Sequence, residues 1–403
     1  MSKIIYLDNH ATTPVDPRVL KAMLPYFKEC FGNAASRSHS FGSEAFQAVE
    51  KARAQVAALI NAEPWEIIFT SGATESNNLA LKGAAEANRG RGDHVITLTT
   101  EHRSVFDSCK RLEMTGRSIA PTDVSRSKDR GLERSGFRVT YLPVRSDGLI
   151  DLSQLKKAVT LKTILISVLL AHNEIGVIQP LAEIGRLARA KGILLHSDAA
   201  QALGKIPLDV KKMNVDLLSI TAHKIHGPKG IGALYLRKTG PQVRLLPLMD
   251  GGGHEGGFRS GTLNVPGIVG FGEACRIYSK SNRLKRESVR LAKLRNRLKD
   301  KLLKEIKGCR VNGSLEFRLP NNLNVSFDGV DAKTLMTGLK GIALSSGSAC
   351  LSTSDEPSYV LKALGISEDR RRSSVRFGLG RFNTTDDIDR AARQIIRVMN
   401  EAQ

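Results

Sequence analysis

Two apolar runs of the chain each lead to a residue that can take part in carbonyl chemistry. One run leads from Leu194 to Asp198, and the other leads from Leu217 to Lys224. Apolar runs of this length are typical of buried strands, so we expect two strands to bring the acid and the amine to one pocket. A lysine that attacks carbonyl groups must lose its proton near neutral pH, and an acid can hold a ring nitrogen protonated. Together they match the needs of a pyridoxal phosphate enzyme, whereas either residue alone is better explained as a buried strand end or a surface lysine.

The segment Phe69–Ser76 would suit a phosphate group. It follows a strand-like run and precedes a helical pattern, and its small residues let backbone N–H groups approach an anion at the helix N-terminus. The hydroxyl of Thr74 can add one more donor. A capped turn with Thr74 as the N-cap residue would explain the same pattern without any ligand.

Strand-like runs alternate with helical patterns through the first two thirds of the chain. This alternation predicts an α/β fold with a mostly parallel sheet, helices on its faces, and ligands at the carboxyl ends of the strands. The predicted strands are Ile67–Thr70, His94–Leu98, Thr163–Leu170, Ile193–His196, Leu217–Thr221 and Ala233–Leu236, and the predicted helices are Ser76–Asn88, Val105–Leu112 and Leu181–Lys191.

The glycine-rich stretch Gly251–Gly261 predicts a boundary. A long helix, a strand at Leu323–Phe327, a loop around Cys350 and a terminal helix from Thr385 follow it. We expect residues 15–260 to form a large cofactor-binding domain, and residues 1–14 and 261–403 to form a smaller α+β domain.

The composition is that of a globular protein, with 41% hydrophobic and 25% charged residues among 403. No apolar stretch reaches the length of a membrane span, and Met1–Asp8 lacks the apolar region of a secretory signal, so we expect a cytoplasmic protein without membrane contact. The cysteines are odd in number and contain no C-x-x-C pair, which argues against a disulfide framework or a zinc site; we expect no resident metal. They are Cys30, Cys109, Cys275, Cys309 and Cys350.

The net charge of +21 could reflect nucleic-acid binding, an acidic partner or a basic soluble surface. Basic residues concentrate at Arg117–Arg138, Arg283–Lys307 and Arg370–Arg376, but aromatic residues make up only 5% of the chain. Leucines recur at helical spacing within Arg283–Lys307, so its charges fit the solvated face of an amphipathic helix. We therefore expect no direct nucleic-acid binding.

Taken together, the chain resembles the cysteine desulfurases of the IscS/NifS type, which are aminotransferase class V enzymes. The resemblance covers nearly the whole chain and implies the fold type I of pyridoxal phosphate-dependent transferases, with pyridoxal 5'-phosphate as the cofactor. The matching segments are Tyr6–Pro14, Thr70–Asn78, Glu101–Arg103, Asn173–Gly176, Ser197–Gln201, His223–Gly232, Gly251–Thr262, Ser345–Cys350 and Arg376–Arg381.

Carried over residue by residue, the resemblance implies how the cofactor is held. Lys224 would form its Schiff base, Asp198 would pair with the pyridine nitrogen, and Gln201 would bond to the ring hydroxyl. His102 would stack on the ring and move protons. The phosphate would be held by Ala73, Thr74, Thr221 and His223, joined by Thr262 from the other subunit of a homodimer.

The resemblance also implies a sulfur-transfer reaction. Asn173 would contact the cofactor and, together with Arg376, would hold the carboxylate of L-cysteine. Arginine suits this task because its planar guanidinium meets both carboxylate oxygens. Cys350 lies in the small, polar segment Ser345–Ser354, which predicts an exposed, mobile loop. Its thiolate would accept the sulfur, leave L-alanine, and pass the persulfide to an unidentified scaffold or carrier, for iron–sulfur cluster assembly or tRNA thiolation. A transient role of Cys350 as an iron–sulfur ligand stays open.

Two other functions remain as alternatives. A selenocysteine lyase or another class V enzyme would share Lys224 and Asp198 but would not need Cys350 in this way. The second is a basic adaptor that carries sulfur on tRNA or DNA. Such an adaptor would not need the complete set of catalytic residues that this chain retains.

Three features depart from the family pattern. Arg117–Gly136 has the composition of an inserted surface loop, and the chain ends at Gln403 without the longer tail by which some relatives dock a scaffold protein. Gly256 stands where an arginine is expected.

Overall fold

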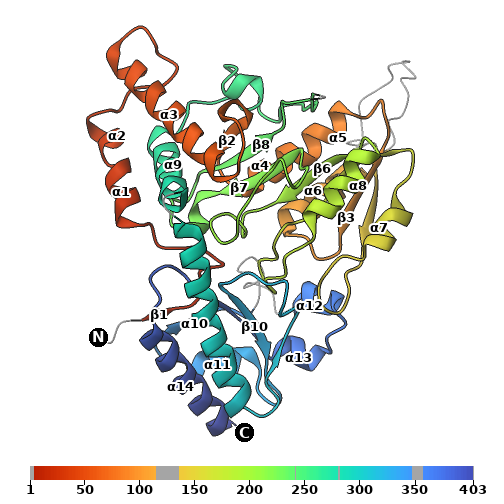
Figure 1. The fold of residues 1–403 in the computed structure, drawn as a ribbon, viewed down its shortest axis with the longest axis vertical. Helices are drawn as coiled ribbons and strands as arrows, with labels where there is room; N and C mark the ends of the chain where they lie inside the picture. Colours follow the sequence, from red (N-terminus) through yellow and green to blue (C-terminus); the bar gives the residue numbers. More distant parts are fainter. Residues whose placement is uncertain (1–3, 115–135, 241, 280–281, 347–356, 403) are drawn as a thin grey trace, which may run out of the picture.

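The computed structural model describes residues 4–114, 136–240, 242–279, 282–346 and 357–402. A seven-stranded sheet with helices on both faces forms the upper part of the molecule in Figure 1, and a smaller layer of strands and helices lies below it. The expected α/β architecture is confirmed.

The large sheet has the strand order β2-β8-β7-β6-β5-β3-β4. The five strands from β7 to β4 pair in parallel, and β8 runs antiparallel to both of its neighbours. All six predicted strands are present, and β4, an edge strand with an exposed first residue, is an addition. The strands are β2 (Ile67–Thr70), β3 (His94–Leu98), β4 (Arg138–Leu142), β5 (Thr163–Ser167), β6 (Leu194–Asp198), β7 (Leu217–Thr221) and β8 (Gly232–Leu236).

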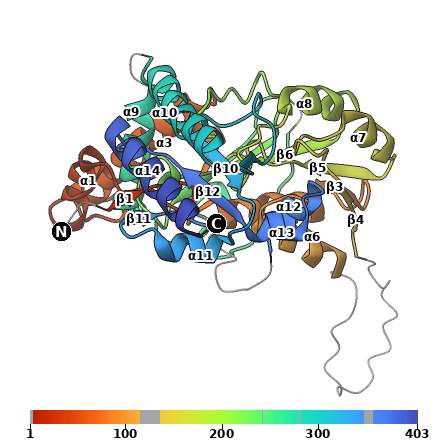
Figure 2. The same ribbon diagram turned by 90° about the horizontal axis from the view of Figure 1, so that it is seen from below.

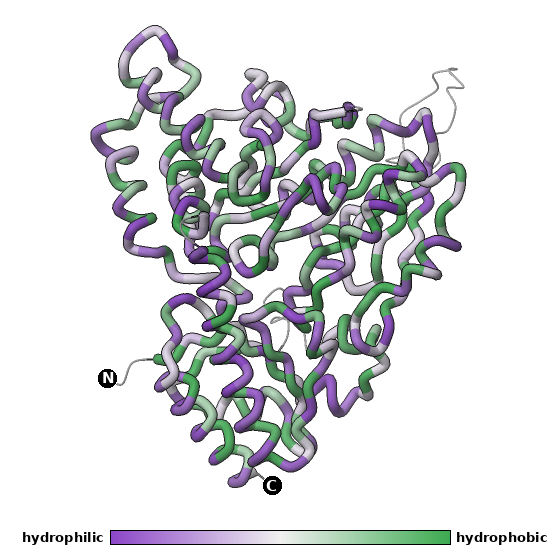
Figure 3. Tube along the Cα trace, viewed as in Figure 1, coloured by the Kyte–Doolittle hydropathy of each residue, from purple (hydrophilic) through white to green (hydrophobic). Residues whose placement is uncertain are grey.

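Helices cover both faces of this sheet. Seen from below, α7 and α8 lie on one face and α6 on the other (Figure 2). The strands are hydrophobic along most of their length, as Figure 3 shows, because both of their faces are covered. The helices around the sheet are α1 (Pro17–Met23), α2 (Pro25–Lys28), α3 (Ser40–Leu59), α4 (Ala73–Asn78), α5 (Ala84–Ala87), α6 (Arg103–Met114), α7 (Leu152–Ala158), α8 (Leu181–Ala190) and α9 (Val265–Ser279).

The predicted helix Ser76–Asn88 is divided in the structure. A π-helical segment, Leu79–Gly83, separates α4 from α5. Such segments are often found near functional sites, and here the segment follows the helix that begins at the expected phosphate site.

The lower layer combines the N-terminal strand with the C-terminal part of the chain. β1 (Ile5–Tyr6) pairs in parallel with β11 (Ile342–Ala343). A second sheet has the antiparallel order β12-β10-β9. Its strands are β9 (Arg310–Val311), β10 (Asn322–Ser326) and β12 (Ser374–Gly378), and the helices of this layer are α10 (Arg283–Glu305), α11 (Ala332–Gly338), α12 (Tyr359–Ala363), α13 (Glu368–Arg372) and α14 (Thr385–Ala402).

Helix α10 confirms the amphipathic prediction for its segment. Leu291, Leu294, Leu298 and Leu302 are buried in the core of the lower layer. Helix α9 differs, because its buried side chains belong to the core of the large sheet, where it packs on α3. The domain boundaries 15–260, 1–14 and 261–403 remain a proposal.

None of the helices in the described parts of the chain combines the length and apolar character needed to cross a membrane. At the glycine-rich boundary, Gly256 adopts a φ of +66°, a left-handed conformation that glycine accepts more readily than arginine. This backbone conformation gives a local reason for the departure from the family pattern at this position.

Candidate active site

A cavity of about 520 Å³ lies at the carboxyl ends of β6 and β7. Asp198 ends β6 and Thr221 ends β7, so the parallel strands bring both residues to one edge of the sheet. Ten of the predicted site residues line this cavity. They are Ala73, Thr74, His102, Asn173, Asp198, Gln201, Thr221, His223, Lys224 and Arg376.

The carboxylate of Asp198 is buried and fixed at the cavity wall. It accepts hydrogen bonds from Nδ2 of Asn77 at 2.7 Å and from the backbone N–H of Ala200 at 2.9 Å. Both donors are neutral, so a protonated ring nitrogen bound in the cavity would supply a counter-charge to this acid.

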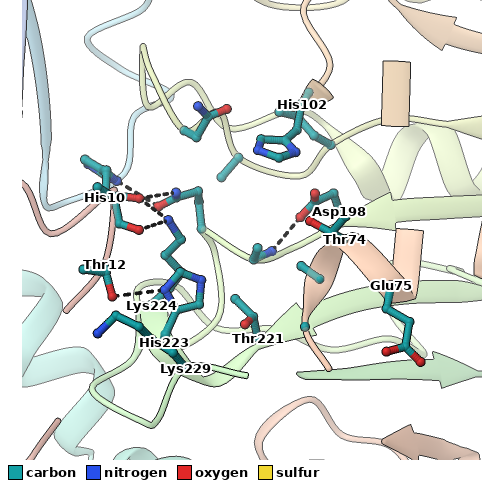
Figure 4. A pocket seen from close by; sticks show the side chains of 18 of the residues that line it. His10, Thr12, Thr74, Glu75, His102, Asp198, Thr221, His223, Lys224 and Lys229 are labelled. Atoms are coloured by element: carbon teal, nitrogen blue, oxygen red, sulfur yellow. Dashed lines mark hydrogen bonds between the residues drawn. The ribbon is translucent and has the colours of Figure 1, made fainter. Parts of the chain in front are cut away.

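Lys224 ends the 3₁₀ turn Ala222–Lys224 that follows β7, and its side chain extends toward the N-terminal segment (Figure 4). The ammonium group donates to the backbone carbonyl of His10 and, at 2.7 Å, to that of Ala11. The backbone carbonyl of Lys224 in turn accepts a hydrogen bond from the buried Lys205 at 3.1 Å. Both ends of this residue are therefore held by groups distant in the sequence.

His102 lies across the cavity from Lys224 (Figure 4). Nδ1 of the ring contacts the hydroxyl of Ser104 at 2.8 Å, and this hydroxyl also accepts from Asn77 at 2.8 Å. The same Asn77 amide holds Asp198, so the acid and the histidine share one hydrogen-bonded support.

Gln201 is fixed by the N-terminal segment. Its Oε1 contacts Nδ1 of His10 at 2.8 Å, and its Nε2 donates to the His10 carbonyl at 3.0 Å. Burial, with a smaller contribution from the Arg376 charge, lowers the pKa of His10 well below its usual value. His10 is therefore neutral, and its ring orients Gln201 at the cavity.

The expected phosphate end of the cavity carries several donors. Helix α4 begins at Ala73, and the first N–H groups of a helix have no acceptor within it. Nδ1 of His223 contacts the hydroxyl of Thr12 at 3.2 Å. Burial and the neighbouring Lys224 and Lys229 charges lower the pKa of His223 to about 4, so its ring is neutral near pH 7.

Arg376 enters the cavity from the lower layer and is only 1% exposed. Its Nη2 donates to Oδ1 of Asp8 at 2.7 Å, and its Nη1 donates to the carbonyl of Asn173 at 3.0 Å. The guanidinium thus lies between Asp8 of the N-terminal segment and the turn that contains Asn173.

Comparison with known proteins decides the family. The sequence profile of the family described as aminotransferase class-V matches residues 5–391. A curated relative, the cysteine desulfurase IscS of Anaeromyxobacter sp. (strain K), is 56% identical over 391 residues, which cover 96% of this chain and 91% of the relative. The chain belongs to the cysteine desulfurases of the aminotransferase class V family.

Solved structures of the same family have the same fold. A NifS-like protein superposes with a TM-score of 0.87 at 38% identity, covering 99% of this chain and all of the other. SspA in complex with cysteine superposes with a TM-score of 0.79 at 36% identity, covering 94% of this chain and 99% of the other.

Cysteine desulfurases of this class depend on pyridoxal phosphate, and the residues of the cavity fit that group. The fit rests on three groups that line the cavity. Asp198 is a buried acid with neutral partners, and Lys224 offers an amine. The start of α4 offers backbone N–H donors and the hydroxyl of Thr74. Asp198, Lys224 and the α4 N-terminus would hold the ring nitrogen, the aldehyde and the phosphate respectively.

Sequence reasoning gave no role to several residues that support the site. Asp8 and His10 belong to the Tyr6–Pro14 motif, which signalled the family but not these contacts. Asn77 lies in the Thr70–Asn78 segment that supplied Thr74, and Ser104 directly follows the Glu101–Arg103 segment that supplied His102. Their contacts depend on how the sheet brings distant segments together.

Three predicted features are not among the residues that line the cavity. Thr262 is described and exposed, and it does not line the cavity of its own chain. Cys350 lies outside the described residues, as do residues 117–135 of the predicted insertion.

The four described cysteines are free thiols. Cys109 and Cys275 are buried, and burial raises the pKa of both thiols. Burial, with the Asp328 charge, raises the pKa of Cys309 to about 12, and a hydrogen bond to Glu44 raises the pKa of Cys30. All four are therefore poor sources of thiolate near neutral pH.

Glu174, next to Asn173, has a buried carboxyl group whose ionisation should affect the stability of the protein. Its carboxyl is fully buried, and burial raises its pKa from 4.5 to about 7, although Ser358 and Arg376 act in the opposite direction. Because the folded state keeps this proton to a higher pH than the unfolded state, stability should fall as pH rises from about 4.5 to about 7. Glu174→Gln removes the ionisable group and with it the free-energy cost of ionising a buried carboxyl.

We expect Glu174→Gln to stabilise the protein at pH 8 by up to about 3 kcal/mol and to leave its stability near pH 4 unchanged. Thermal unfolding across this pH range measures the effect. Glu183→Gln is the matched control, since Glu183 is exposed on α8. Equal unfolding temperatures for Glu174→Gln and the parent protein at pH 8 would contradict the prediction, because they would show that ionisation of Glu174 does not destabilise the fold.

Proposed function

We propose that the protein converts L-cysteine to L-alanine and forms a persulfide on Cys350. The observation that carries this proposal is the placement of Lys224 and Asp198, with Asn173 and Arg376, around one cavity. The first pair suits the cofactor and the second pair suits an amino-acid carboxylate, so the cavity offers a place for both.

Substrate binding rests on the two residues between the layers. The Arg376 guanidinium would hold the carboxylate of L-cysteine, and the side-chain amide of Asn173 would donate to the same group. This arrangement fixes the amino acid by the end that does not react, which leaves its Cα and its thiol to face the catalytic residues.

Proton transfer rests on Lys224 and His102. Bound pyridoxal phosphate supplies an aldehyde for the substrate amine and a ring that accepts electron density from Cα. Nζ of Lys224 takes the α-proton of L-cysteine and later returns a proton to the product. Asp198 would keep a proton on the ring nitrogen of the bound cofactor, and His102 would stack on that ring and hold a proton near the substrate sulfur.

Sulfur transfer rests on Cys350. Its thiolate attacks the sulfur of the substrate, so a sulfur–sulfur bond forms while the bond between Cβ and sulfur breaks. The electron pair of the broken bond stays with the carbon skeleton, which takes up protons and leaves as L-alanine. The persulfide then passes its outer sulfur to an acceptor protein, a scaffold or a sulfur carrier, in the cytoplasm.

An assay of products tests this proposal. Purified protein with pyridoxal phosphate, L-cysteine and a thiol reductant should release L-alanine and sulfide in equal amounts. Release of pyruvate and ammonia instead of alanine would contradict the proposal. Alanine formed from selenocysteine but not from cysteine would favour the lyase alternative.

We also propose that the active form is a homodimer in which Thr262 reaches the phosphate site of the partner subunit. Thr262 is exposed and absent from its own cavity. The segment before it carries the exposed apolar side chains Leu246, Leu248 and Met249, which a partner subunit would cover.

Light scattering after size exclusion should therefore give twice the mass of one chain. Thr262→Ala should leave that mass unchanged and weaken retention of the cofactor during dialysis, because one phosphate donor is lost. A monomer with full activity would contradict the dimer.

A further inference from the structure

The ion pair between Asp8 and Arg376 has no role in the reaction proposed above. Arg376 lies 1% exposed, and its Nη2 is 2.7 Å from Oδ1 of Asp8. A residue that must receive a substrate carboxylate is thus already joined to a carboxylate of its own chain. This contact raises the question of what the acid contributes.

The backbone of Asp8 is joined to the strand that carries Arg376. Asp8 forms a bridge with Gly378, whose N–H donates to the Leu7 carbonyl at 2.6 Å. The N–H of Asn9 donates to the Gly378 carbonyl at 3.0 Å. A Cβ on Gly378 would come within 2.7 Å of the His10 backbone nitrogen, so the two segments pack too closely for a side chain there.

The contacts of Arg376 fix its guanidinium on two sides. Asp8 takes one N–H of Nη2, and the Asn173 carbonyl takes one N–H of Nη1. The Nε–H is buried and has no hydrogen-bond partner among the described residues. Arg376 lines the cavity, so its guanidinium keeps donor capacity beyond these two bonds for an anion bound there.

Arginine has a long, flexible side chain, so fixing its fork before the substrate arrives removes an ordering cost from binding. Asp8 supplies this fixation through a charge-assisted hydrogen bond, and it offsets the cost of burying the arginine charge without substrate. We propose that Asp8 is a positioning residue that holds Arg376 in the orientation that receives the substrate carboxylate. This inference rests on the proposed function, because it assumes that Arg376 binds that carboxylate.

A pair of ligands that differ by the carboxylate tests the inference. L-cysteine carries the carboxylate and cysteamine lacks it, so only L-cysteine should depend on Arg376 and Asp8. The affinities are measured from the change in cofactor absorbance, in the holoenzyme with Cys350→Ser as the background to prevent turnover. Asp8→Ala, Asp8→Asn, Arg376→Gln and the double variant Asp8→Ala with Arg376→Gln are compared.

We expect Asp8→Ala to weaken L-cysteine binding by about tenfold or more and to leave cysteamine binding unchanged. Asp8→Asn keeps an acceptor oxygen but loses the charge, so it should recover part of the loss. Asp8→Ala should have no further effect once Arg376 is Gln. Asp389→Ala is the matched control, because it removes an acid paired with Arg297 at 2.6 Å on the exposed side of the lower layer.

Unchanged L-cysteine affinity in Asp8→Ala would overturn the inference, as would an equal loss for both ligands, which indicates a structural role alone. Failure of the proposed function gives a different result. If Arg376→Gln weakens neither ligand, or both equally, Arg376 does not bind the carboxylate. The inference on Asp8 alone fails if Arg376→Gln weakens L-cysteine selectively and Asp8→Ala does not.

Discussion

Lys224→Ala should lower alanine formation by about a thousandfold or more, because it removes both the amine that binds the cofactor and the base that takes the α-proton. The purified variant should retain its fold, since the Lys224 ammonium donates to the backbone carbonyls of His10 and Ala11 at the cavity wall. Any cofactor that remains should no longer be attached covalently. Reduction with borohydride followed by peptide mass spectrometry identifies the residue to which the cofactor is attached.

Lys229 is the matched control for this experiment. It lines the same cavity and lies five residues further along the chain, so it is an alternative amine for the cofactor. Lys229→Ala should keep the covalent link at Lys224. A cofactor found attached to Lys229 in the parent protein would contradict the assignment.

Cys350→Ser should abolish alanine formation from L-cysteine while the fold, the bound cofactor and the affinity for L-cysteine persist. A hydroxyl group cannot accept sulfur as a thiolate does, so the bond between Cβ and sulfur has no acceptor. The loss should exceed about a hundredfold, as for other groups that act directly in the chemical step. Alanine release and absorbance titration with L-cysteine measure the two halves of this prediction.

Cys309→Ser is the matched control, because Cys309 lies in the lower layer and burial raises its pKa to about 12. This variant should form alanine at the parental rate. A Cys350→Ser protein that still forms alanine at the parental rate would reject the persulfide step and favour direct elimination. Selenocysteine cleavage by Cys350→Ser would not reject the persulfide step, since selenium leaves without a thiol acceptor more readily than sulfur does.

The large sheet could be predicted because its strands are short, apolar and buried on both faces. Such runs are recognisable in the sequence, and the rule that ligands bind at the carboxyl ends of parallel strands then places Asp198 and Thr221 together. The edge strand β4 was missed because it begins at the exposed Arg138 and its three middle residues are only partly buried. β2, at the other edge, was predicted because its four residues are all buried and the first three form a continuous apolar run, which β4 lacks.

The supporting contacts of the site could not be predicted in the same way. His10 and Asp8 reach Gln201 and Arg376 across more than 190 positions of the chain, and nothing in the spacing indicates these pairs. The π-helical segment Leu79–Gly83 was also missed, because it differs from an α-helix in hydrogen bonding and not in its apolar pattern.

The position of the transferred sulfur tests the central claim most directly. The holoenzyme is given one equivalent of L-cysteine without reductant, and its peptides are then compared by mass spectrometry before and after reduction. We predict one added sulfur atom on the peptide that contains Cys350, released by reduction, with an equal amount of L-alanine in solution. Added sulfur on another cysteine, or alanine formed with no sulfur on Cys350, would contradict the account.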